Sequence, residues 1–151
     1  MKSVRIGIVG LGFMAATHVK ACRRVPGAII TALCNPSGRH LDGDFSKVAG
    51  NIGGNDPIKL DMNGVRAYRT VQDLLADPNV DAIDICSPTS SHPELLLAAL
   101  QAGKHVLCEK PLARTSKEAK AMVAEADKAR TFFMPAMCIR FWPEWAWVRQ
   151  A

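Results

Sequence analysis

A glycine-rich segment near the start of the chain has the residue types and spacing of a phosphate-binding turn. Gly10, Gly12 and Ala15 form a Gly-x-Gly-x-x-Ala pattern directly after a short apolar run. Gly10 would permit a tight turn, Gly12 would let the backbone approach a pyrophosphate, and Ala15 would let a following helix pack closely on a strand. That helix, beginning at Phe13 and Met14, would offer unpaired N–H groups and partial positive charge to the phosphates. The pattern favours a dinucleotide site over a purely structural glycine turn.

Residues 35–39, which follow the apolar run 28–34, bear on which dinucleotide would bind. Asn35 stands where many NAD-binding domains carry an Asp or Glu that accepts hydrogen bonds from the adenosine ribose and repels a 2′-phosphate. Asn keeps hydrogen-bonding capacity without the negative charge, and Ser37 and Arg39 follow within reach of a phosphate. The sequence therefore favours NADP over NAD as the cofactor. The same composition, with Pro36 and Gly38, would also suit a plain turn.

The elements that must position these residues alternate along the chain. Apolar runs bounded by turn signals predict strands over residues 4–9, 28–34, 65–68, 80–85, 105–108 and 132–137. Helices are predicted over residues 13–24, 70–75, 91–103 and 116–130. The last two would begin with capping boxes, one of Ser91 with Glu94 and one of Thr115 with Glu118. Residues 38–64 hold six of the eleven glycines and show no firm helical period.

Alternating strands and helices predict an α/β fold, a Rossmann-type doubly wound parallel sheet of about six strands. Each parallel return needs a crossover connection, which a helix usually supplies. In such sheets ligands bind at the carboxyl ends of the strands, where the winding reverses. The glycine turn and Asn35 would both lie at that edge.

Composition and charge narrow the class of protein. The 151 residues are 48% hydrophobic and 22% charged, which is typical of a globular domain and argues against a disordered chain or a coiled coil. No apolar run approaches the roughly 20 residues that span a bilayer, so we expect no membrane partner. The apolar run near the start is broken by glycines and suits a cytoplasmic strand better than a secretory signal.

The net charge of +5 is carried by residues 1–75, which suits an anionic small ligand. Nucleic acid is not an expected partner, because the basic residues are scattered and the single Tyr belongs to no RNA-reading motif. The five cysteines fit neither a CxxC pair nor a zinc-ligand spacing, so we expect reduced, buried thiols and no metal site.

Four ordered motifs resemble those of the glucose-fructose oxidoreductase / inositol dehydrogenase / rhizopine catabolism (Gfo/Idh/MocA) family. After the glycine turn, Ile85 to Glu94 looks like the family's turn after the fourth strand, and residues 102–112 match its Glu-Lys-Pro motif. Arg140 to Pro143 resembles the sequence that follows the sixth strand. The likeness covers nearly the whole chain apart from residues 38–64. It implies a nicotinamide cofactor and hydride transfer to or from a hydroxyl-bearing carbon, usually on a sugar or cyclitol.

The resemblance also implies roles for single residues. Lys110 would be the catalytic residue, lying beside the nicotinamide and the reacting hydroxyl for acid/base work, and Glu109 would set the cofactor and Lys110 in place. The alternative is an exposed lysine before a turn proline. The family analogy also suggests a cis bond between Lys110 and Pro111. Ser87, Pro88, His92 and Arg140 complete the expected cofactor contacts.

Two histidines need separate interpretation. His92 would either contact the cofactor or steady the turn at Ser87 and Pro88, and its position at the start of a helix favours the supporting role. His18, on the first helix, is expected to be a packing or surface residue.

Family members continue into a second domain that supplies much of the sugar pocket and commonly an Asp and a His that share the proton transfer. We therefore expect residues 1–138 to form an NAD(P)-binding domain and residues 139–151 to begin the connection to a substrate domain that this chain lacks. Such a chain would bind NADP or NAD with little or no turnover, and a sugar or polyol only with a second domain. A non-catalytic nucleotide-binding or assembly module is the alternative.

The C-terminal segment is rich in aromatic residues. Phe141, Trp142, Trp145 and Trp147 would form an apolar surface with no evident cover. Such surfaces usually mark association, which predicts a homo-oligomer or a partner chain bound through this segment. Alternatively, these side chains fold back onto the domain's own helices.

Overall fold

The computed structural model describes residues 3–48 and 58–150 and is built on one six-stranded sheet. The strands run in the order β3-β2-β1-β4-β5-β6, and every neighbouring pair is parallel. The chain therefore winds outward from β1 to one edge and then crosses to the other, which confirms the predicted doubly wound fold. The strands are β1 (Val4–Val9), β2 (Ala28–Cys34), β3 (Arg66–Tyr68), β4 (Ala82–Ile85), β5 (His105–Cys108) and β6 (Phe133–Pro135).

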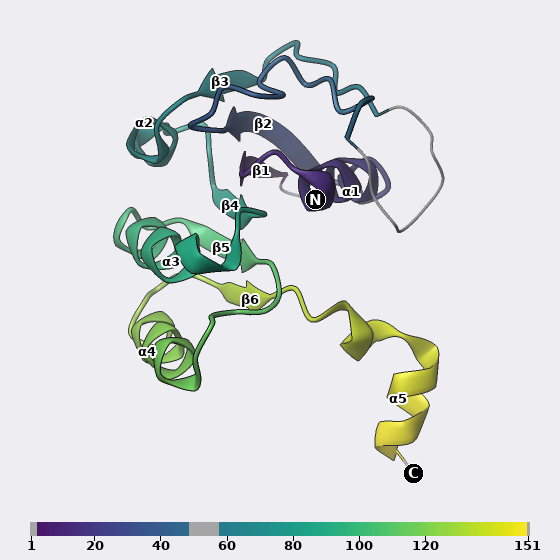
Figure 1. Cartoon of the computed structure of the whole chain (residues 1–151), viewed down its shortest axis with the longest axis vertical. Coiled ribbons are helices and arrows are strands. Elements are labelled where there is room, and N and C mark those ends of the chain that lie inside the picture. The colour runs from purple at the N-terminus through teal and green to yellow at the C-terminus, as the bar shows by residue number, and fades with distance from the viewer. Residues whose placement is uncertain (1–2, 49–57, 151) are drawn as a thin grey trace.

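Helices cover both faces of the sheet (Figure 1). The covering helices are α1 (Phe13–Cys22), α2 (Val71–Ala76), α3 (His92–Gln101) and α4 (Ser116–Ala126), and a fifth helix, α5 (Pro143–Gln150), lies away from the sheet. Residues alternate along a strand between the two faces, and so Ile8 and Val9 of β1 enter different cores. Val9 packs in the core that includes Leu96 of α3 and Met122 of α4. Ile8 packs with Val19 of α1.

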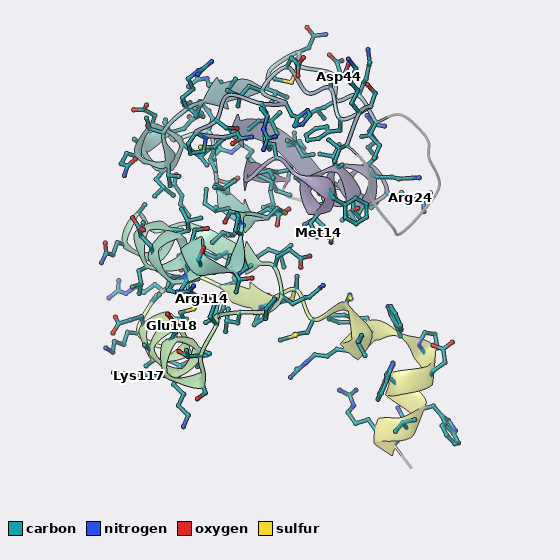
Figure 2. The ribbon with its side chains drawn as sticks, in the orientation of Figure 1. Met14, Arg24, Asp44, Arg114, Lys117 and Glu118 are labelled. Carbon is teal, nitrogen blue, oxygen red and sulfur yellow. The ribbon has the colours of Figure 1, made fainter. Side chains whose placement is uncertain are left out.

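The helix starts show one prediction confirmed and one wrong. At α4, Thr115 Oγ1 accepts the N–H of Glu118 and the Glu118 carboxylate accepts the N–H of Thr115, which is the predicted capping box. Figure 2 shows Glu118 on this helix. At α3 no such box forms, because Ser91 has helical backbone angles at the end of a short 3-10 turn, η1 (Thr89–Ser91). A capping side chain needs an extended backbone to face the third N–H of the helix. The Ser91 hydroxyl instead donates to Pro88 O at 2.8 Å.

Several element ends differ from the sequence predictions by a few residues. The first helix ends at Cys22 rather than Arg24, and the fourth ends at Ala126, four residues early, where Asp127 becomes its cap. The last strand is confined to Phe133–Pro135, the stretch that pairs with β5. Within residues 38–64, Phe45 is buried against α1, and 49–57 lie outside the described residues.

The C-terminal segment extends away from the sheet (Figure 1). A short 3-10 turn, η2 (Cys138–Phe141), leads into α5. The C-terminal segment carries four large aromatic residues, each with more than half of its surface exposed: Phe141, Trp142, Trp145 and Trp147. The alternative in which these side chains fold back onto the domain's helices is therefore not the arrangement seen. Among the described residues, no helix is both long and apolar enough to cross a membrane.

Candidate dinucleotide site

The carboxyl ends of β1, β2 and β4 border an open groove of about 590 Å³. Most of the residues predicted to bind the cofactor lie along it. Its lining consists of Gly10, Leu11, Gly12, Phe13, Met14, Asn35, Arg39, His40, Lys47, Val48, Cys86, Ser87 and Pro88. Three segments that are far apart in the sequence meet here, because the strands that carry them are neighbours in the sheet.

Gly10 makes the turn at the end of β1. Its φ of +84° lies in the region that favours glycine, and its N–H donates to Cys34 O at 3.0 Å. A β-carbon at this position would lie 2.5 Å from Ser87 Cα. Gly10 is therefore needed both for the turn and for the close approach of the segment after β4.

Gly12 leaves open space at the N-terminus of α1. It is the N-cap residue with no side-chain cap, and a β-carbon built on it would meet no heavy atom within 4 Å. The first N–H groups of a helix have no intrahelical partner and carry partial positive charge. Ala15, fully buried behind this turn, lets α1 pack on the sheet. These features fit a bound pyrophosphate.

Asn35 takes part in a turn and also lines the groove. Its Oδ1 accepts hydrogen bonds from the N–H and the hydroxyl of Ser37, and its Nδ2 donates to Arg39 O at 2.8 Å, so it builds a turn. It also lines the groove, together with Arg39. Ser37 is turned toward Asn35 and is absent from the lining. Lys47, which the sequence analysis did not single out, adds a second cation.

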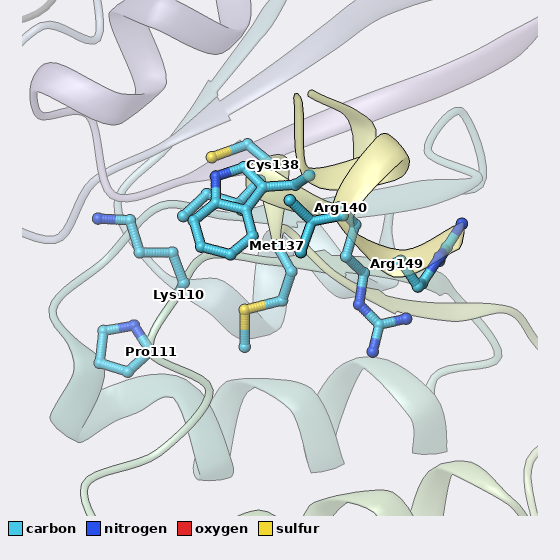
Figure 3. A pocket seen from close by; sticks show the side chains of 9 residues that line it. Lys110, Pro111, Met137, Cys138, Arg140 and Arg149 are labelled. Atoms are coloured by element: carbon cyan, nitrogen blue, oxygen red, sulfur yellow. The ribbon is translucent and has the colours of Figure 1, made fainter. Parts of the chain in front are cut away.

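Lys110 lies at the same edge of the sheet, two residues after β5. It is exposed, its peptide bond to Pro111 is cis as the resemblance suggested, and its N–H donates to Glu109 Oε2 at 2.8 Å. Lys110 and Pro111 form one side of a second cavity, of about 680 Å³, and Arg140 and Arg149 lie on the other (Figure 3). Arg140 therefore lines the Lys110 cavity and not the dinucleotide groove.

His92 joins the two parts of this edge. Its ring is 1% exposed, with Nδ1 3.0 Å from Pro111 O and Nε2 2.9 Å from Ser87 O. The ring thus ties the turn after β4 to the turn after β5. This is the supporting arrangement that its helix-start position favours.

His18 is the site residue that sequence reasoning missed. It is neither a surface nor a simple packing residue: its Nδ1 lies 2.8 Å from Asp84 Oδ2 and its Nε2 lies 3.1 Å from Glu109 Oε1. Burial opposes the charged ring, but the hydrogen bonds and charges of the two carboxylates outweigh it, so the pKa of His18 is raised. Asp84 within the apolar run of β4 was the available signal, since a buried carboxylate needs a partner.

The cysteines are free, but not all are buried. Cys34 and Cys108 are buried, whereas Cys138 is exposed because it lies on η2, outside the sheet's core. Cys22 and Cys86 are half-buried. The expectation of burial is therefore wrong for Cys138 and only partly met by Cys22 and Cys86. Ligand atoms of His18, Asp84 and Cys86 lie within 4.8 Å of one another, a spacing that could suit a metal ion. Both ring nitrogens of His18 already face carboxylates, however.

A glycine turn between β1 and α1, at the switch point of a six-stranded parallel sheet, defines this chain as a dinucleotide-binding Rossmann domain. Residues 4–137 match a family model described as an oxidoreductase family with an NAD-binding Rossmann fold. The chain belongs to this family, Gfo/Idh/MocA.

Individual relatives agree with this assignment. Myo-inositol 2-dehydrogenase from Thermotoga maritima is 31% identical over 138 residues, covering 91% of this chain and 37% of the relative. Inositol 2-dehydrogenase 1 from Saccharopolyspora erythraea is 34% identical over 151 residues, covering 99% of this chain and 41% of the relative. The chain thus spans about two-fifths of the length of these two relatives.

A solved structure shows the same arrangement of the backbone. The oxidoreductase from Agrobacterium radiobacter in complex with NAD+, L-tartaric acid and magnesium superposes with a TM-score of 0.75 at 27% identity. The match covers 93% of this chain and 37% of that one.

Proposed function

We propose that this chain binds NADP in preference to NAD in the groove at the carboxyl ends of β1, β2 and β4. The observation that carries the proposal is the space left by Gly12 at the N-terminus of α1, where a pyrophosphate would meet N–H groups and no side chain. The A. radiobacter structure, which holds NAD+, supports a nicotinamide dinucleotide as the ligand.

The charge of the groove supports NADP as the preferred form. Arg39 and Lys47 line it beside Asn35, and none of its described lining residues is an Asp or Glu. A 2′-phosphate would therefore meet two cations and no carboxylate. An NAD site commonly holds an acidic residue at the position of Asn35.

We further propose that the whole protein is an oxidoreductase acting on a hydroxyl-bearing carbon of a sugar or cyclitol. Both curated relatives named above are inositol dehydrogenases. When bound, the nicotinamide supplies or accepts the hydride. Lys110 would hold a proton at the substrate oxygen as the catalytic residue, and Glu109 and His92 would fix the turn that carries it.

Parallel calorimetric titrations of this chain with NADP and NAD test the binding proposal. We expect binding of both with tighter binding of NADP, and a rise in melting temperature because a ligand of the native state must stabilise it. If neither NADP nor NAD binds, the proposal is rejected. Little or no reduced nicotinamide should form from a panel of polyols, since in the family a second domain supplies much of the sugar pocket.

Lys110→Met tests the catalytic role in the complete enzyme. Oxidoreductase activity should be lost while most of the cofactor affinity remains. Full activity in this variant would reject the role of Lys110. Absence of oxidoreductase activity from the complete protein without any substitution would instead favour the second candidate, a non-catalytic nucleotide-binding module that reuses the fold.

The exposed aromatic side chains of α5 and η2 favour association of this chain as a homo-oligomer. Phe141 is 73% exposed and Trp147 is 70% exposed. Light scattering at high concentration should show more than one copy, and a clean monomer would count against the proposal. A cytoplasmic location, expected from the sequence, stays a prediction.

A further inference from the structure

A buried network of three ionisable side chains connects α1 to the residue before Lys110. The side chains of His18, Asp84 and Glu109 are 15%, 4% and 7% exposed. The imidazole lies between the two carboxylates, with Nδ1 2.8 Å from Asp84 and Nε2 3.1 Å from Glu109. Asp84 belongs to β4, and Glu109 follows β5, so the ring joins three elements.

Two ionised carboxylates on opposite sides of the ring require two N–H groups on it. A neutral imidazole has one N–H and one lone pair. In the neutral state, one carboxylate would therefore face a nitrogen lone pair in a poorly solvated place, where an unpaired charge is costly. The imidazolium form gives each carboxylate a donor.

The other titratable groups around the ring do not change this requirement. Cys86 Sγ lies 3.5 Å from His18 Nδ1. Cys22, four residues along α1, lines a small apolar cavity together with His18 and Asp84. Burial, followed by the charge of Asp84, raises the pKa of both thiols, which keeps them neutral near pH 7. The remaining facing groups are the carboxylates of Asp84 and Glu109.

The Glu109 carboxylate contacts both the His18 ring and the backbone of Lys110. One carboxylate oxygen faces His18, and the other accepts the Lys110 N–H at 2.8 Å. The Glu109 N–H donates to Ile85 O, so its backbone is fixed to β4. His18 is thus in a position to set the orientation of the carboxylate that holds the Lys110 backbone.

We propose that His18, as an imidazolium, is a positioning residue for Lys110 and acts through Glu109. The proposal deepens the proposed function, on which it rests, because the placement of Lys110 matters for the reaction assigned to this edge of the sheet. The arrangement of Lys110 then depends on pH. It is held while the ring is charged and released as the pH rises through the raised pKa of the ring.

The sign of the effect follows from linkage. A histidine whose pKa is raised on folding stabilises the native state fully below the ordinary value of about 6.5. That contribution is lost as the pH rises through the raised value. Both the stability term and the hold on Lys110 should therefore fade on the alkaline side.

Nuclear magnetic resonance of this whole chain between pH 5 and pH 9 tests the proposal directly. We expect both His18 ring nitrogens to be protonated at pH 6, and the Lys110 amide resonance to titrate with the same midpoint as the ring, above 6.5. In His18→Gln the Lys110 amide should lose this titration. The matched control is His105→Gln, which alters a ring that accepts the Phe132 N–H at the opposite end of β5 and should leave the Lys110 titration in place.

A purely structural role would not make the Lys110 amide follow the protonation of the ring. A singly protonated ring at pH 6, or a Lys110 amide that does not follow the ring's titration, would overturn the proposal. If His18→Gln does not fold, Asp84→Asn serves instead. This substitution should lower the titration midpoint of the His18 ring by one pH unit or more, and the midpoint of the Lys110 amide should move by the same amount. A Lys110 midpoint that does not change would also overturn the proposal.

The proposed cofactor binding is judged separately, by the melting temperature with and without dinucleotide. A chain that shows coupled titration of His18 and Lys110 but no response to either dinucleotide would keep the network and reject the binding site. The reverse result would keep the binding site and reject the role of His18.

Discussion

Gly10 and Ser87 lie in backbone contact at the start of the dinucleotide groove. A β-carbon on Gly10 would lie 2.5 Å from Ser87 Cα and 2.6 Å from Ser87 N. The turn after β1 is therefore packed directly on the segment after β4, with no room for a side chain. Two residues further on, a β-carbon on Gly12 would meet nothing. The two glycines of one motif thus serve different purposes.

Gly10→Ala should destabilise the fold. The positive φ alone costs about 1–3 kcal/mol for a residue with a side chain, and the contact with Ser87 backbone adds to it. Urea unfolding of the two chains should show a lower midpoint for the variant. An unchanged midpoint would mean that the backbone at Gly10 and Ser87 is not packed as described.

Gly12→Ala is the matched change at the other glycine. Stability should stay nearly constant because the methyl group enters open space, while dinucleotide affinity should fall at least about tenfold, or about 1.4 kcal/mol, because the methyl group occupies the phosphate's place. Calorimetry and urea unfolding on the same sample separate the two effects. Undiminished affinity would remove Gly12 from the binding site.

Asn35→Asp should shift the preference from NADP toward NAD. The new carboxylate would repel a 2′-phosphate and could accept hydrogen bonds from the ribose hydroxyls. We expect the ratio of NADP to NAD affinity to fall about tenfold, a typical size for one local interaction. Asn35→Ala is the control, because it removes the hydrogen bonds with Ser37 and Arg39 without adding charge, whereas Asp loses only the bond that Nδ2 donates to Arg39 O. A ratio that is equal in all three chains would exclude Asn35 from specificity.

One thiol should react much faster than the others with an aromatic disulfide reagent at pH 8. The thiolate is the reactive form. Cys138 is exposed, whereas burial, followed by nearby carboxylate charge, raises the pKa of Cys34 to about 11 and of Cys108 to about 12. Cys138→Ser should abolish the fast phase in the native chain. A fast phase that survives this substitution would show that a second thiol is accessible.

Local pattern was sufficient to predict the strands and the glycine turn. The second strand has the bounds that its apolar run predicts, Ala28–Cys34, and β1 and β5 likewise match. The capping box of Thr115 with Glu118 was also predictable, because both partners lie within one turn of chain. The Ser91 box was not, because the turn that precedes it, η1, sets the backbone of Ser91 in a helical conformation.

The amino-acid sequence by itself determined where the six strands, the first four helices and the glycine turn occur, since these follow from the spacing of apolar residues and glycines over a few positions. It did not predict α5, which lies away from the sheet. Only the tertiary structure decided that Gly10 abuts Ser87 and that His18 lies between Asp84 and Glu109, which are 66 and 91 residues further along the chain. The order of strands in the sheet brings these residues together. No local pattern contains that order, because it is set by which apolar faces pack on one another.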